Sequence, residues 1–241
     1  MGEVQHSDLH YAILETAKTA RAFHAGNNLK LEDSERINTA YGIFADEVDE
    51  FINKGFRADN IDEVIDGAID GLFTISEFTM ILDGNTRLFT RKYTHDLGML
   101  GDCCDSKPLP KNIEEAVNIL EKYTDDIALT IEDDKYIFHV LCKTISILER
   151  VGYDMVTYLK TVNSSNMSKF PLVSSIKDPK ETVSLIIDEG RYQGVEYKVV
   201  VLEGEERYVF TATKDLESGK DFPTGKVVKH SSYFVEPVFN K

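Results

Sequence analysis

The sequence predicts a mainly α-helical protein with a small β-rich segment at its C-terminal end. Up to residue 170, apolar residues recur mostly at three- and four-residue steps, the period of a helix with one buried face. After residue 170 the period changes, and short runs rich in Val, Ile, Tyr and Phe follow. We therefore expect a helical domain over 1–170, with an insertion at about 84–132, and a β-rich extension over 171–241.

Length and composition indicate a globular protein. The 241 residues are 42% apolar and 29% charged, with only 6 Pro and 15 Gly. The net charge of −15 argues against nucleic acid or a membrane surface as a partner, because both attract a basic face. No apolar run approaches the roughly 20 residues of a transmembrane helix, and the N-terminus does not resemble a signal peptide. We expect a cytoplasmic protein.

Three long helices are expected before residue 84. Ser7 can cap a first helix that stops near Gly26. Ser34 can cap a second, which Gly55 ends. A third begins at about 59–60, and its broad apolar face predicts a buried central helix.

The rest of the chain alternates breakers with regular segments. Gly and Pro residues make 84–111 irregular, and we expect further helices over 112–126 and 133–151 and a short one through 155–159. Strands are expected at 183–188, 196–202 and 206–213. Residues 203–205, Glu-Gly-Glu, fit a short hairpin loop between the last two.

Five carboxylates fall on the second and third expected helices. Glu47 and Glu50 are three residues apart, so both emerge from one side of the second helix. Glu63, Asp66 and Asp70 follow steps of three and four and share one line of the third. The short connection between the helices favours antiparallel packing, which would bring the two acidic lines together.

Such a cluster is typical of a divalent cation site. Oxygen-only ligands suit Mg²⁺, or Mn²⁺, rather than zinc. Like charges beside an apolar stripe are costly unless a cation compensates them. The alternative is a solvated acidic face, because 42 acidic residues place several such pairs by chance. Burial of the carboxylates distinguishes the two interpretations.

The spacing of these carboxylates carries a resemblance to a known family. Glu47 and Glu50 form ExxE, twelve residues intervene, and Glu63 and Asp66 form ExxD. This arrangement resembles the all-α nucleoside triphosphate pyrophosphohydrolase superfamily, which includes MazG-like proteins and phosphoribosyl-ATP pyrophosphohydrolases.

Three further segments resemble the phosphoribosyl-ATP pyrophosphohydrolase-like branch. They are an NMSK sequence within 163–170, a GKVVK sequence at 225–229 with a tyrosine after it, and 22–24 at the end of the first helix. The residues that this match implies in substrate binding are Asn166, Lys169, Lys229, Tyr233 and His24. The structural alternative is a surface lysine at a helix end or in a tail, and for the histidine an interaction with its own helix terminus.

The resemblance implies hydrolysis of the α–β bond of a (deoxy)nucleoside triphosphate, with Mg²⁺ or Mn²⁺, in control of the nucleotide pool. It ranks three carboxylates first as metal ligands, namely Glu47, Glu50 and Asp66. Glu63 and Asp70 share the remaining role, and either Glu47 or the adjacent Asp46 is the general base. It also implies a homodimer or homotetramer.

Two departures from the family pattern keep an alternative open. Many relatives carry Glu where this chain has Gly67, and roughly fifty extra residues stand before the helix at 133 and another fifty between 170 and 225. The alternative is a catalytically degenerate nucleotide-binding or interaction protein.

Overall fold

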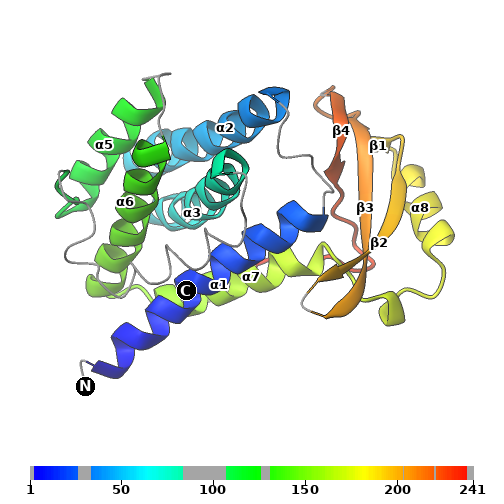
Figure 1. The fold of residues 1–241 in the computed structure, drawn as a ribbon, viewed down its shortest axis with the longest axis horizontal. Coiled ribbons are helices and arrows are strands. Elements are labelled where there is room, and N and C mark those ends of the chain that lie inside the picture. Colours follow the sequence, from blue (N-terminus) through cyan, green and yellow to red (C-terminus); the bar gives the residue numbers. More distant parts are fainter. Residues whose placement is uncertain are drawn as a thin grey trace. The chain divides into compact units, whose positions relative to one another are not determined.

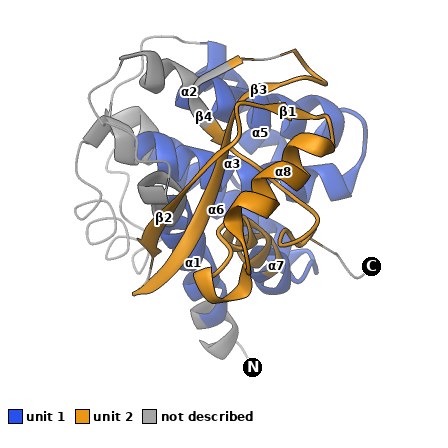
Figure 2. Ribbon diagram, turned by 90° about the vertical axis from the view of Figure 1, so that its right-hand side faces the viewer, with its two compact units in different colours: residues 1–21, 30–160 blue, residues 22–29, 161–241 orange. Residues whose placement is uncertain are grey.

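The computed structural model describes residues 3–26, 34–83, 107–125, 131–202, 204–219 and 221–237. These residues are mainly helical, with a small antiparallel sheet near the C-terminal end (Figure 1), so the expected fold class is confirmed at that level. None of the described helices has the length and apolar character needed to cross a bilayer. The chain forms two compact units (Figure 2): residues 1–21 with 30–160, and residues 22–29 with 161–241.

The first unit is a helical bundle around α3. Its elements are α1 (Glu3–Gly26) up to residue 21, α2 (Ser34–Asp49), the π-helix η1 (Glu50–Phe56), α3 (Ile61–Asp83), α5 (Ile113–Asp125) and α6 (Ile131–Arg150). Helix α3 packs against α2, η1 and α6. From Val64 to Thr79 every residue of α3 is buried except Asp66, Asp70 and Glu77, so the expected central helix is confirmed and its acidic residues are the exceptions.

Several helix boundaries differ from those expected. The first helix begins at Glu3, one turn before the expected cap at Ser7, and the second changes to a π-helix at Glu50 instead of running regularly to Gly55. The short helix expected through 155–159 is the longer α7 (Met155–Ser168). Helix α5 lies within the expected insertion and packs against α2 and α6, so this part belongs to the bundle; 84–106 and 126–130 lie outside the described residues.

Two glycines allow η1 and α3 to approach until their backbones touch. A Cβ at Gly67 would lie 2.8 Å from the Cα of Phe51, and a Cβ at Gly55 would lie 2.8 Å from the backbone nitrogen of Val64. Real Cβ atoms do not come this close to backbone. Position 67, where the resemblance implies Glu in many members of that family, therefore has no room for a side chain in this packing.

The second unit is a four-stranded antiparallel sheet with helical segments on both faces. Its elements, besides the end of α7, are η2 (Val173–Ser175), α8 (Pro179–Asp188), β1 (Tyr192–Gln193), β2 (Glu196–Leu202), β3 (Glu205–Asp215) and β4 (Asp221–Val227). Strand β3 is central and pairs with the other three. The expected hairpin is confirmed, since Leu202 pairs with Glu205 and Gly204 has φ +82°.

Successive residues of β3 contribute to different clusters. Phe210 packs with Ile186 of α8, whereas Val209 packs with Phe170 and with Met167 of α7. The end of α7 is thus part of the sheet's core, and the second compact unit includes residues 161–241. The roughly fifty extra residues between 170 and 225 build α8 and β1 to β3.

The strand expected at 183–188 is wrong, because this segment is the end of α8. The side-chain carboxylate of Asp178 accepts a hydrogen bond from the Lys180 N–H at 2.9 Å, and Pro179 occupies the first helical position. Thr182 and Ile186 are buried four residues apart, which is helical spacing. A cap and a proline at the start therefore override an apolar run that favours a strand.

The contact at Gly67 gives a first prediction. Gly67→Ala should destabilise the first unit by about 1–3 kcal/mol, because the new methyl group meets backbone that cannot yield without separating the helices. Urea unfolding followed by circular dichroism measures this effect. The matched control is Gly71→Ala on the same helix, where a Cβ meets only side-chain atoms of Leu141 at 3.4 and 3.6 Å. It should be neutral or stabilising by up to about 1 kcal/mol. Equal effects of the two substitutions would contradict a backbone contact.

Candidate metal centre

Glu47 lies near the crossing of α2 and η1 with α3, and its environment disfavours the ionised form of its carboxyl group. Burial, and to a smaller extent the negative charges of four nearby carboxylates, together raise the pKa of Glu47 from 4.5 to about 8. In order of their effect these are Asp70, Glu50, Asp66 and Asp46. Carboxylates from both helical segments are therefore close enough to Glu47 to repel its charge.

The helix crossing explains why these side chains converge. Phe51 meets Gly67, and Gly55 meets Val64, so the two segments run in opposite directions past each other. Glu50 and Asp66 immediately precede the two residues in contact. Because the segments are antiparallel, one turn back from Phe51 corresponds to one turn forward from Gly67. Glu47 lies four residues before Phe51, and Asp70 lies next to position 71, four residues after Gly67. The register thus places Glu47 opposite Asp70.

The same register separates Glu63 from the centre of the cluster. Position 63 lies opposite the Gly55 end of η1, and the charges of Glu50 and Glu63 both help to raise the pKa of the exposed Lys54. Lys54 Nζ donates a hydrogen bond to Glu50 Oε1 at 2.6 Å, which is the largest contribution. Glu63 is not among the four carboxylates with the largest effect on Glu47. The structure therefore associates Asp70 with Glu47, and Glu63 with Lys54.

The donor set fits a hard divalent cation in its chemistry and charge. It consists of carboxylate oxygens alone, it is held on two packed helical segments, and its central member is half-buried. In the parts of the chain that the structure describes, however, no three His, Cys, Asp or Glu side chains are gathered into a ready-made metal site. Because like-charged carboxylates repel one another, gathering them around a cation requires rotation of side chains on a backbone that is already in place.

Three of the expected substrate-binding residues form one cluster in the second unit. Lys169 Nζ donates a hydrogen bond to Asn166 Oδ1 at 2.6 Å and lies 5.9 Å from the ring centre of Phe234. Lys229 Nζ lies 4.9 Å from the same ring. We call Asn166, Lys169, Lys229 and Phe234 the cationic cluster. The NMSK segment and the end of the GKVVK segment thus come together around the ring of Phe234, a residue that no motif in the sequence marks.

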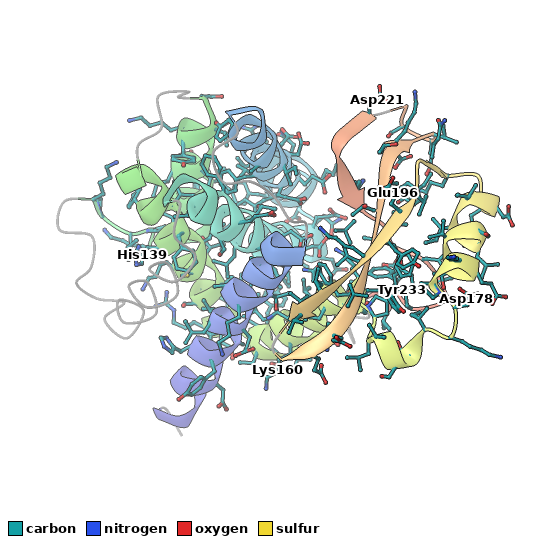
Figure 3. The ribbon with its side chains drawn as sticks, turned by 45° about the vertical axis from the view of Figure 1, so that its right-hand side comes forward. His139, Lys160, Asp178, Glu196, Asp221 and Tyr233 are labelled. Carbon is teal, nitrogen blue, oxygen red and sulfur yellow. The ribbon has the colours of Figure 1, made fainter. Side chains whose placement is uncertain are left out.

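Tyr233 has a structural environment. Its hydroxyl donates to the carbonyl oxygen of Val228 at 2.9 Å, and its ring stacks on Phe210 with 5.4 Å between centroids. Burial raises the pKa of the Tyr233 hydroxyl above its usual range. Figure 3 shows Tyr233 among the side chains between the sheet and α8. Of the remaining candidates, Asp46 is exposed on α2, and the side chain of His24 on α1 lies outside the described residues.

Comparisons with known proteins identified no relative of this chain. No protein-family model matches the chain, and neither the curated proteins nor the solved structures contain a match. Any assignment of function therefore depends on the residues and the geometry described above.

The environment of Glu47 gives a prediction for stability against pH. With a folded-state pKa of about 8 against 4.5, the folded protein binds more protons than the unfolded chain between these values, so stability falls as pH rises through this window. Glu47→Gln should remove that part of the dependence, up to about 1.4 kcal/mol per pH unit. Urea unfolding in the presence of a chelator, at several pH values, measures the difference from the wild type.

The control for this experiment is Glu114→Gln, an exposed carboxylate in the first turn of α5. Its unfolding free energies should run parallel to those of the wild type. If Glu47→Gln also ran parallel, the burial and repulsion described for Glu47 would be wrong.

Proposed function

We propose that the protein is a Mg²⁺-dependent nucleoside triphosphate pyrophosphohydrolase that cleaves the α–β bond of a (deoxy)nucleoside triphosphate. The observation that carries the proposal is the close crossing of η1 and α3 at Phe51 and Gly67, flanked on both sides by carboxylates. The ExxE and ExxD motifs that resemble this enzyme superfamily are the sequence segments that meet there. Agreement of motif and packing supports the proposal more than either does alone.

The roles of the acidic residues follow from the register. Glu47, Glu50, Asp66 and Asp70 would hold the cation, and Glu63 would act from the edge of the cluster beside Lys54. When bound, Mg²⁺, or Mn²⁺ in its place, neutralises phosphate charge and lowers the pKa of a coordinated water. The general base, which accepts the proton of the attacking water, would be either the half-buried Glu47 or the exposed Asp46 beside it.

The cationic cluster of the second unit is a separate feature that supports nucleotide binding. Two ammonium groups, from Lys169 and Lys229, share one aromatic ring, and Asn166 fixes the first of them. Ammonium groups bind phosphate, and a ring can stack with a base. In a chain of net charge −15, a local group of this kind favours a small anion over a long polyanion.

The direct test is pyrophosphate release from a panel of nucleotides. We expect turnover of at least one of dUTP, dCTP, the purine deoxynucleotides and phosphoribosyl-ATP with Mg²⁺, and none with chelator. Glu47→Gln and Asp66→Asn should each lower kcat/KM by about 100-fold or more, because each removes charge that holds the cation.

Asp62→Asn is the matched control for that test, since Asp62 is an exposed carboxylate on the same helix, α3. It should keep activity within a few-fold of the wild type. Nucleotide binding without turnover of any member would favour the degenerate binding protein, and the absence of both would leave the carboxylates as a solvated face.

The opposing register of Glu47 and Asp70 gives a further prediction. Asp70→Asn should cost as much activity as Glu47→Gln, about 100-fold, whereas Glu63→Gln should cost less than about 10-fold. Activities are compared on the preferred nucleotide at saturating Mg²⁺, with circular dichroism to verify folding. The reverse order of effects would assign the ligand role to Glu63 and overturn the register argument.

A further inference from the structure

A serine, a histidine and a glutamate form a hydrogen-bonded chain in the second unit. His230 follows β4 and is only 6% exposed. Its Nδ1 lies 2.7 Å from the hydroxyl oxygen of Ser232, and its Nε2 lies 3.1 Å from Oε1 of Glu189, just after α8. Ser232 and Glu189 are both exposed, so the buried ring connects two side chains that solvent reaches.

The backbone assigns the hydrogen positions on the histidine ring. The amide N–H of Ser232 also points at Nδ1, at 3.2 Å, so Nδ1 is the acceptor nitrogen. Nε2 then carries the hydrogen and donates it to Glu189. The Ser232 hydroxyl is left to donate to Nδ1. This is the arrangement in which a histidine acts as base toward a serine hydroxyl while a carboxylate stabilises the ring.

The histidine is held in place by its surroundings. The amides of Tyr233 and Phe234 donate to the carbonyl oxygen of His230 at 3.1 and 2.8 Å. The ring lies 5.9 Å from the ring of Tyr233, which the carbonyl of Val228 anchors in turn. The base is therefore positioned before any substrate arrives, and little reorganisation accompanies proton transfer.

An open hollow of about 480 Å³ lies in front of these groups. Its lining consists of Leu185, Asp188, Glu189, His230, Ser231 and Ser232. Leu185 is an exposed apolar side chain, 46% accessible, that a small acyl group can cover. Asp188 and Glu189 are exposed acidic residues, which disfavour an anionic substrate.

We propose that Ser232 is the nucleophile of a second site, which hydrolyses small esters of neutral or cationic alcohols. Ser232 Oγ attacks the ester carbonyl carbon while its proton passes to Nδ1 of His230. The carbon–oxygen bond to the alcohol then breaks, and the alcohol leaves with that proton. Water hydrolyses the acyl-serine and restores the hydroxyl. This chemistry uses none of the carboxylates of the candidate metal centre.

The structural alternative is that the contact of His230 with Ser232 only stabilises a tight turn. It makes a different prediction, because a turn needs no reactive hydroxyl. Labelling with a fluorophosphonate, followed by peptide mass spectrometry, therefore distinguishes the two. We expect label on Ser232, and none on the neighbouring exposed Ser231.

Hydrolysis of p-nitrophenyl acetate by the full chain is the matching activity test. Ser232→Ala should reduce the rate to that of buffer, and Glu189→Gln should reduce it by about 10-fold or more through loss of support for the ring. Ser231→Ala is the matched control and should retain the wild-type rate. A choline ester should be a better substrate than an ester of similar size that carries a carboxylate.

The three variants, Ser232→Ala, Glu189→Gln and Ser231→Ala, change exposed residues, so thermal melting should show folded proteins. Absence of label on Ser232, equal label on Ser231, or ester hydrolysis unchanged in Ser232→Ala would each overturn the proposal. Activity toward nucleotides does not enter this test, so its failure would leave the proposed pyrophosphohydrolase untouched.

Discussion

The contact between the backbones of Gly67 and Phe51 is the constraint on which the candidate metal centre depends. It brings η1 against α3 with no side chain between them, and it fixes the register in which acidic residues on one segment oppose those on the other. A change of one residue in this register would turn the carboxylates toward different neighbours. Gly55, which meets Val64, provides a second contact that prevents such a shift. The π-helix η1 contains both contact residues, Phe51 and Gly55, and it begins at Glu50, three residues after Glu47.

The crossing carries an electrostatic cost. Burial and four neighbouring carboxylates all act against ionisation of Glu47, and α3 carries half-buried acidic residues within an otherwise buried stretch. Lys54 offsets part of this charge on the Glu50 side of the cluster. Like charges that could separate freely would do so, but a fixed backbone prevents it. A divalent cation is the simplest group that would turn this repulsion into binding.

Most helices could be predicted because their period and caps are local properties of the sequence. The same holds for the hairpin at Gly204. The helix over 183–188 could not be predicted from period alone, because its apolar residues suit either a strand or a half-buried helix. The N-cap at Asp178 favours the helix. Spacing also predicted which carboxylates share a helix side, but not which ones oppose each other. The register of the contact between η1 and α3 decides that Asp70, and not Glu63, lies opposite Glu47. This register is a property of the tertiary structure. Phe234, between two lysines, carried no local signal at all.

The glycine at position 67 acquires a different meaning from this packing. Compared with the pattern of the resembled family, Gly67 indicates the loss of a metal-ligating carboxylate and hence a catalytically degenerate protein. In the structure it is the residue that lets the two helical segments meet, and a glutamate there would collide with Phe51. Forcing the segments apart would also separate Glu50 from Asp66, which flank the contact. The packing of η1 on α3 therefore explains the glycine at this position, and Gly67 by itself is no sign of a degenerate protein.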